Sequence, residues 1–236
     1  MEIINRKKEA PSLLEELSQS SVNRRKFLRY SGIFGATVIA LGSANGLSGC
    51  KKDDDEKGVN LGSGDIGVLN YAYALEQLEA AFYTQVVSSQ YSGITTAETA
   101  YLTDIRDHEI AHREFFKTAL GSNAIRALEV DFSSVNFASR ASVLGTAKAF
   151  EDLGVSAYNG AGRLLTDANN LLTAGKIVSV EARHAALIRD LLAAISFASS
   201  DVVDANGLDK ARTPSDVLSI AGTYIKTKIN ASNLPQ

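Results

Sequence analysis

Two Glu-x-x-His tetrads constrain the fold of this chain more than any other feature of its sequence. They are Glu109-Ile110-Ala111-His112 and Glu181-Ala182-Arg183-His184, and each has a glutamate upstream, Glu76 before the first and Glu151 before the second. The separations between the glutamates, 33 and 30 residues, suit a helix, a turn and a return to the same height on an antiparallel neighbour. The pattern therefore predicts four helices that bring six side chains to one layer.

The two halves of this pattern repeat one another. A tyrosine follows each upstream glutamate by seven positions, Tyr83 after Glu76 and Tyr158 after Glu151. Seven residues are about two turns of a helix, so each pair lies on one helical face. The sequence is thus an internal duplication in pattern.

The hydrophobic periodicity predicts an all-α chain. Apolar residues recur at three- and four-residue steps over residues 65–89, 95–120, 139–166 and 173–198. The three prolines lie at positions 11, 214 and 235, so none interrupts these segments. Residues 121–138 lack helical periodicity and are long enough to cross a bundle from end to end. We therefore expect two helical hairpins joined by one long crossover.

The candidate ligands lie within the apolar seams of these helices. A carboxylate in such a seam costs several kcal/mol unless a cation or partner compensates it. Two divalent ions would balance the four glutamates, and two neutral histidines add nitrogen ligands without changing that balance. Mixed carboxylate and imidazole ligation suits iron or manganese. We expect two divalent metal ions, with iron favoured and manganese the alternative.

The pattern resembles the di-metal carboxylate proteins of the ferritin-like superfamily, which includes bacterioferritin, rubrerythrin and manganese catalase. The resemblance covers residues 65–198, and the sequence around Glu76 is similar to bacterial ferritin-like-domain lipoproteins. It implies a four-helix bundle with one long crossover. It also implies bridging ligands at Glu109 and Glu181, and terminal ligands at Glu76, Glu151, His112 and His184. Tyr83 matches a tyrosine that ferritins place near the metals, and the duplication extends this role to Tyr158, which makes both tyrosines candidate catalytic residues.

Three assignments have alternatives. Glu79 lies one turn beyond Glu76 and is the other candidate ligand on the first helix, in which case Glu76 faces solvent or a neighbouring chain. His108 lies four residues before His112 and is either half of a zinc-binding pair or a histidine outside the ligand set. Position 180, four residues before His184, is valine, which favours the second interpretation of His108. The two tyrosines are either functional or plain core residues.

Residues 1–49 have the pattern of an export signal. Arg24 and Arg25 belong to a segment that resembles a twin-arginine motif, and a Gly-rich apolar stretch then leads to Leu47-Ser48-Gly49-Cys50, which resembles a lipobox. Cys50 is the sole cysteine and the predicted site of lipidation. Residues 50–64 are predicted to form a flexible tether. We expect a lipid-anchored protein facing the periplasm or the cell surface; the alternative is that the apolar stretch spans the membrane.

Residues 199–236 are predicted to add a fifth helix that starts at Thr213-Pro214-Ser215. This extension either packs on the bundle or forms a homo-oligomer contact. From Cys50 onward, 17 Lys and Arg face 23 Asp and Glu, a formal charge of −6. An acidic domain without a basic stripe argues against nucleic acid as a partner.

These observations lead to an expected function. The first hypothesis is an extracytoplasmic oxidoreductase that acts on dioxygen or hydrogen peroxide, as a ferroxidase or a catalase does. The alternative is a metal-binding or stress-protective surface lipoprotein without turnover. An iron-storage cage is disfavoured, because a lipid and a tether on every subunit would crowd a shell.

Overall fold

Four long helices form most of the computed structural model, which describes residues 58–235. They are α4 (Gly64–Ser88), α5 (Thr96–Leu120), α6 (Arg140–Gly162) and α7 (Ala168–Leu192). The smaller elements are the 3₁₀ turn η1 (Gly121–Asn123), the helix α8 (Pro214–Ala221) and the strands β1 (Val59–Asn60) and β2 (Ile229–Asn230). The predicted signal at Arg24 and Arg25 and the predicted lipidation site at Cys50 lie outside the described residues.

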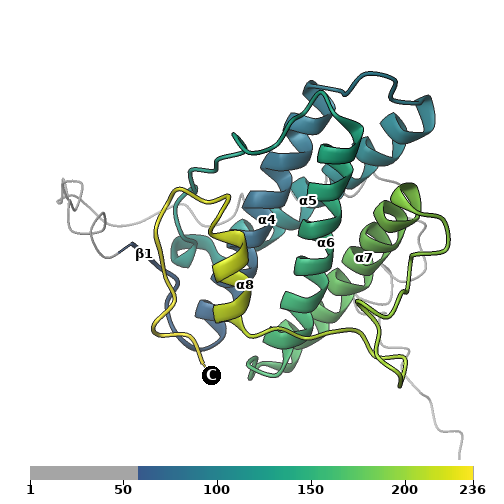
Figure 1. Ribbon diagram of the computed structural model, residues 1–236. Helices are drawn as coiled ribbons and strands as arrows, with labels where there is room; N and C mark the ends of the chain where they lie inside the picture. The colour runs from purple at the N-terminus through teal and green to yellow at the C-terminus, as the bar shows by residue number, and fades with distance from the viewer. Residues whose placement is uncertain (1–57, 236) are drawn as a thin grey trace, which may run out of the picture. The chain divides into compact units, whose positions relative to one another are not determined.

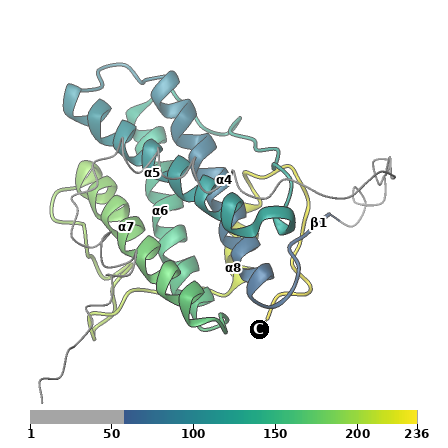
Figure 2. The ribbon, with the colours of Figure 1, turned by 180° about the vertical axis from the view of Figure 1, so that it is seen from behind.

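The four helices pack as two hairpins. α4 lies against α5 and α6 lies against α7, with a further contact between α4 and α6 (Figures 1 and 2). Residues 124–139 connect the hairpins along one side of the bundle. The prediction of an all-α four-helix bundle with one crossover is confirmed.

Local sequence explains both ends of α5. The Thr95 hydroxyl accepts the Glu98 amide at 3.1 Å, while the Glu98 carboxylate accepts the Thr95 amide at 3.0 Å. This capping box satisfies amide groups that the first turn leaves unpaired. The helix ends at Leu120, and the next residue, Gly121, has a φ of 54°, in the left-handed region that favours glycine.

The turn between α6 and α7 differs from the prediction. We expected helices over residues 139–166 and 173–198, but α6 ends at Gly162 and α7 runs from Ala168 to Leu192. Asp65, at the start of α4, accepts hydrogen bonds from both the amide and the hydroxyl of Thr166, at 2.8 and 2.7 Å. It also accepts the Asp167 amide at 3.0 Å. These contacts hold the turn in a non-helical form, and Asp167 caps the next helix.

The predicted tether of residues 50–64 is corrected at its C-terminal end. Val59 and Leu61 are buried, and β1 pairs in parallel with β2 near the C-terminus. Asn70 on α4 donates to the Leu61 carbonyl oxygen at 3.0 Å, which fixes this segment to the bundle. The run looked solvated because Gly and Ser outnumber its apolar residues, yet the two apolar side chains reach the core.

Aromatic side chains attach the crossover to the bundle. Phe132 of the crossover contacts Phe82 of α4 at a ring-centroid distance of 5.7 Å, and Phe82 contacts Phe150 of α6 at 5.0 Å. Tyr224, which follows α8, meets Phe150 edge-on at 4.8 Å. Edge-to-face pairs of this kind add to the energy of burial. The core therefore continues from the bundle to the segments that cover it.

The C-terminal extension packs on the bundle, and α8 begins at Pro214 as predicted. The chain crosses α6 at Arg212, whose amide donates to the Ser156 carbonyl oxygen at 2.9 Å. A Cβ on Gly160 would lie 1.7 Å from the Arg212 carbonyl oxygen, so only glycine permits this crossing. We expected the apolar pattern after Thr213 to mark one helix, but the helix ends at Ala221 and the chain turns into β2.

An ion-pair network fixes the loop after α7. The guanidinium group of Arg189, a side chain only 3% exposed, donates to both carboxylate oxygens of Asp152 on α6, each at 2.7 Å. It also donates to the carboxylate of Asp201 in the loop, at 3.0 and 2.8 Å. Bidentate pairs between arginine and carboxylate combine strength with fixed geometry. This network brings residues 196–201 back against the bundle, which explains why α7 ends before residue 198.

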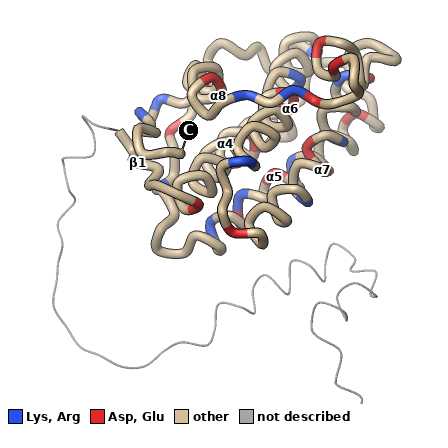
Figure 3. Tube along the Cα trace, turned by 90° about the horizontal axis from the view of Figure 1, so that it is seen from below, with Lys and Arg blue, Asp and Glu red and all other residues tan. Residues whose placement is uncertain are grey.

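Charged residues are distributed along the whole described part of the chain. Figure 3 shows acidic and basic positions interspersed on the helices, without a basic stripe among residues 58–235. Within the same residues, no helix combines the length and the apolar character that crossing a bilayer requires.

Candidate metal centre

The predicted ligands meet in the interior of the bundle. Glu76 on α4, Glu109 on α5, Glu151 on α6 and Glu181 on α7 are each 0% exposed. His184 is also buried, and the His112 side chain is 13% exposed. All six residues point inward because each occupies an apolar-seam position of its helix.

The six side chains form two overlapping groups. Glu76, Glu109, His112 and Glu181 each offer one ligand-type atom, and these atoms lie within 4.8 Å of one another. Glu109, Glu151, Glu181 and His184 form a second group by the same measure. Glu109 and Glu181 belong to both groups, which is the position expected of bridging ligands. Each group also contains one terminal glutamate and one histidine.

The histidines face the glutamates of the opposite tetrad. The Nδ1 atom of His112 lies 2.9 Å from Oε1 of Glu181, and Nδ1 of His184 lies 2.8 Å from Oε1 of Glu109. Nδ1 of His112 is also 3.4 Å from Glu76, and Nδ1 of His184 is 3.6 Å from Glu151. The internal duplication of the sequence therefore becomes an approximate two-fold arrangement of the side chains.

The two predicted tyrosines bond across the duplication. The Tyr83 hydroxyl on α4 donates to Oε1 of Glu151 on α6 at 2.5 Å. The Tyr158 hydroxyl on α6 donates to Oε1 of Glu76 on α4. Each terminal glutamate thus has one oxygen held by a tyrosine and a second oxygen turned toward the centre. Both tyrosines lie in the core and also hydrogen-bond to a terminal glutamate.

The donor set fits a pair of cations. Eight buried ligand-type atoms lack a hydrogen-bond partner of good geometry. They are Oε2 of Glu76 and Glu151, both carboxylate oxygens of Glu109 and Glu181, and Nδ1 of His112 and His184. The two histidine nitrogens among them lie at ion-pair distance from glutamate oxygens but do not form well-aligned hydrogen bonds with them. Buried polar atoms almost always find a partner in proteins. Cations between the two groups would supply partners for all eight atoms.

The electrostatics of the centre agree with this fit. Burial raises the pKa of Glu76 to about 7. Burial and repulsion from Glu109 raise the pKa of Glu181 well above its ordinary value. Burial would also raise the pKa of Glu109, but His112 and His184 outweigh it and lower the value to about 2. Carboxylates crowded at this distance require protons or cations between them.

A fifth carboxylate, Glu79, lies beside the centre. The sequence presented Glu79 and Glu76 as alternatives, one inside and one outside, but both are buried, at 3% and 0% exposure. Glu79 belongs to neither group of ligand-type atoms. A Cβ built on Gly154 of α6 would lie 3.1 Å from Glu79 and 3.4 Å from Glu181. Burial first, and repulsion from Glu181 second, raise the pKa of Glu79 well above its ordinary value.

The sequence contained a signal for this asymmetry. Glu79 follows Glu76 by three residues, and Gly154 follows Glu151 by three residues, so the two occupy equivalent positions in the duplicated halves. A glycine opposite a buried glutamate leaves the space that the longer side chain fills. Comparing the halves position by position would therefore have located Glu79 inside the bundle.

His108 contacts a predicted ligand rather than joining the set. Its Nδ1 atom lies 2.9 Å from Nε2 of His184, and the two rings stack at 5.2 Å. Metal-binding histidines commonly donate their outer N–H group to a carboxylate, a backbone carbonyl oxygen or water, and the His108 ring takes that place beside His184. Asp190, on the same helix as His184, accepts the Ile195 amide in the loop after α7. Of the other aspartates, Asp107 pairs with Arg106 and Asp152 with Arg189.

Comparison with known proteins gives the family of this fold and centre. No match was found among curated proteins. The family model described as a ferritin-like domain matches residues 64–194, which contain all four bundle helices and all six predicted ligands. This match covers more than half of the chain, and the chain therefore belongs to the ferritin-like domain family.

Proposed function

We propose that the protein binds two divalent ions, iron or manganese, and uses them to reduce dioxygen or hydrogen peroxide. The observation that carries the proposal is the pair of four-residue groups that share Glu109 and Glu181. Two shared carboxylates would hold two ions close together, typically about 3.5 to 4 Å apart. Bound reduced ions would supply two electrons, which with two protons convert dioxygen to hydrogen peroxide, or hydrogen peroxide to two molecules of water.

The protein side chains prepare this chemistry in three ways. The packed bundle excludes bulk water from the four glutamates. Tyr83 and Tyr158 orient the terminal glutamates, and their hydroxyl protons lie at the carboxylates. His108 contacts the outer nitrogen of His184 and so orients that ring. Rigid positioning by such contacts holds ligands in a productive geometry.

The proposed setting is extracytoplasmic. Arg24, Arg25 and Cys50 support export by the twin-arginine route and attachment to a membrane through a lipid on Cys50. Export of a folded chain would let the cytoplasm choose the metal before transport. A role in oxidative stress follows from the proposed oxidants.

The second candidate is a metal-binding lipoprotein without turnover. The observation that favours it is the complete burial of the four ligand glutamates, each from a different helix. Ions at that point would join all four helices and stabilise the fold. The two candidates differ in whether an oxidant reaches the centre.

Rapid mixing distinguishes them. Protein loaded anaerobically with ferrous ion is mixed with dissolved dioxygen or with hydrogen peroxide, and the ferric absorbance is followed over time. We expect oxidation faster than in buffer with at least one oxidant, and loss of this acceleration in His112→Ala plus His184→Ala. Glu114→Gln, at an exposed position on α5, is the matched control and should behave as wild type. Oxidation no faster than in buffer would support the structural role.

A further inference from the structure

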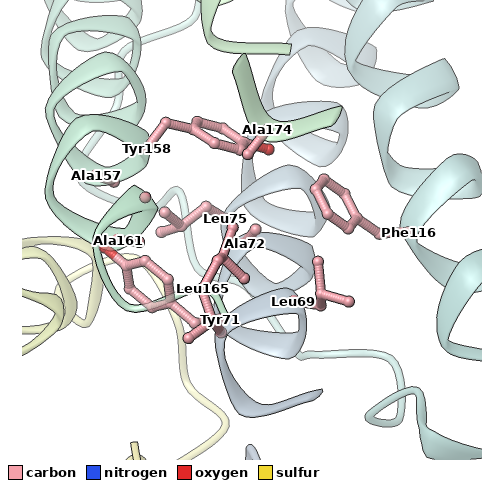
Figure 4. Close-up of a pocket in the computed structure, with 12 residues that line it drawn as sticks. Leu69, Tyr71, Ala72, Leu75, Phe116, Ala157, Tyr158, Ala161, Leu165 and Ala174 are labelled. Atoms are coloured by element: carbon pink, nitrogen blue, oxygen red, sulfur yellow. The ribbon is translucent and has the colours of Figure 1, made fainter. Parts of the chain in front are cut away.

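A small apolar pocket lies next to the metal centre. It is formed between α4, α5, α6 and α7, near the end of the bundle where α4 begins and α6 ends (Figure 4). Ala72 and Leu75 come from α4, Tyr158 and Ala161 from α6, and Phe116 from α5 (Figure 4). The cavity volume is about 20 Å³. This is room for one molecule of the size of water, which needs about 10–15 Å³ by this measure.

The pocket wall favours an apolar occupant. The lining exposes no polar surface to the cavity, and the one lining residue with a buried hydroxyl group that lacks a hydrogen-bond partner is Tyr71. A buried water molecule needs about two to four hydrogen-bond partners, and empty apolar cavities in proteins remain dry and take up apolar molecules such as xenon. Hydrogen peroxide carries two hydroxyl donors, and burying them without partners is unfavourable. Dioxygen is small and apolar and has no such requirement.

The pocket adjoins the ligand layer through Tyr158. Leu75 directly precedes Glu76, and Phe116 follows His112 by one helical turn. Long helical side chains lean toward the helix N-terminus, so the rings of Phe116 and Tyr158 lie back toward the layer of the ligands. The two rings stack at 6.5 Å, and the Tyr158 hydroxyl bonds to Glu76. One wall of the pocket therefore also contacts a candidate ligand.

The opposite wall reaches toward the surface. Gly162, Leu165 and Ala174 line the pocket and are only partly buried, in contrast to Leu75, Phe116 and Tyr158. The side of the pocket nearest the turn between α6 and α7 is therefore its more exposed side.

We propose that this pocket binds dioxygen and supplies it to the metal centre. The inference rests on the proposed function and refines it, because it selects dioxygen over hydrogen peroxide as the oxidant that uses this route. Hydrogen peroxide, if it also reacts, enters elsewhere. The occupancy of the pocket and the reaction at the metals are separate properties and are tested separately.

The first test uses xenon on metal-free protein. Xenon is an apolar probe, and its binding is followed by ¹²⁹Xe NMR and by the methyl resonances of Leu75 and Leu165 under xenon pressure. Ala72→Val and Ala161→Val each add two methyl groups to the pocket wall, whereas Ala81→Val, at a partly buried position on α4 outside the pocket, is the matched control. We expect saturable binding in wild type and in the control, and loss of binding in the two filled variants. Leu165→Ala enlarges the outer wall and should strengthen binding.

The second test compares oxidants on the ferrous-loaded protein. The filled variants should lower the second-order rate constant with dioxygen severalfold and leave the rate with hydrogen peroxide unchanged. The control should match wild type with both oxidants. Melting temperatures identify any variant whose packing is disturbed. The two filled variants lie on different helices, so if one of them does not fold, the other still provides the test.

The outcomes separate the inference from the proposed function. Absence of saturable xenon binding in wild type would overturn the inference. A dioxygen rate unchanged in variants that no longer bind xenon would also overturn it. If neither oxidant reacts with wild-type protein, the proposed function fails, and supply of dioxygen to the metals fails with it.

Discussion

Individual residues determine the asymmetry of an otherwise two-fold centre. The ligands, the histidine contacts and the tyrosine bonds repeat across the duplication. Glu79 and Gly154 do not, since one half has a buried carboxylate where the other has no side chain. His108 is also present in one half only. The two groups of candidate ligands therefore have different surroundings although their residue types match.

The first prediction separates Glu76 from Glu79. Glu76→Gln should weaken one of two metal-binding steps, because its Oε2 atom belongs to a ligand group. Glu79→Gln should retain both steps, since its carboxylate belongs to neither group. Calorimetric titration of each variant with manganese measures the steps. If Glu76→Gln kept both metal-binding steps and Glu79→Gln kept only one, Glu79 rather than Glu76 would be the ligand on α4.

At the scale of elements, contacts between distant segments determine where the helices end. The spacing of apolar residues predicted all four bundle helices, and the predicted segment 95–120 begins within one residue of α5. The end of α6 and the start of α7 were wrong by four or five residues. Their turn is held by Asp65, which is 101 residues away from Thr166 in the sequence. Single-sequence periodicity contains no information on such a partner.

The second prediction concerns the crossing of α6 by the C-terminal extension. Gly160→Ala should lower the free energy of unfolding by about 2 kcal/mol or more, because the new methyl group overlaps the Arg212 carbonyl oxygen. Gly145→Ala is the matched control on the same helix, with nothing within 4 Å of the added Cβ. The control should gain about 0.5–1 kcal/mol from helix propensity. Urea denaturation of both variants measures the changes, and equal effects would show that the extension does not press on α6.

At the scale of the whole molecule, the fold concentrates negative charge in its interior. Five glutamates from four helices meet within the core, and the surrounding loops and C-terminal extension cover the bundle. The spacing in the sequence predicted that the six candidate ligands come together. The burial of Val59 and Leu61, the aromatic contacts of the crossover and the network around Arg189 depend on the folded chain and were not predicted.

The third prediction is that metal-free protein loses stability as the pH rises from about 5 to about 8. Glu76, with a pKa raised to about 7 from 4.5, keeps its proton when folded at pH values where the unfolded chain has lost it. This group alone lowers the free energy of unfolding by on the order of 3 kcal/mol across the range. The pKa of His184 is raised to about 11, so this group stabilises the folded protein fully below pH 6.5 and contributes less as the pH rises above that value. The pKa of Glu109 is lowered to about 2, so this group contributes the same stabilising free energy at every pH in the range.

Metal addition should reverse this trend. Cations replace the protons among the carboxylates, so binding is tighter at high pH, and the gain in melting temperature is larger at pH 8 than at pH 5. Thermal unfolding with and without manganese, at both pH values, measures the effect. A melting temperature of metal-free protein that rises with pH over this range would contradict the electrostatics of the centre.

The most direct test of the account is the number of metal ions bound by each chain. Purified protein is reconstituted with iron or manganese, freed of excess metal and measured by elemental analysis, beside His112→Ala plus His184→Ala and the Glu114→Gln control. We predict about two ions per chain in wild type and in the control, as expected for a two-metal site, and a loss of metal in the double variant. Wild-type protein that binds no metal after reconstitution would contradict the account.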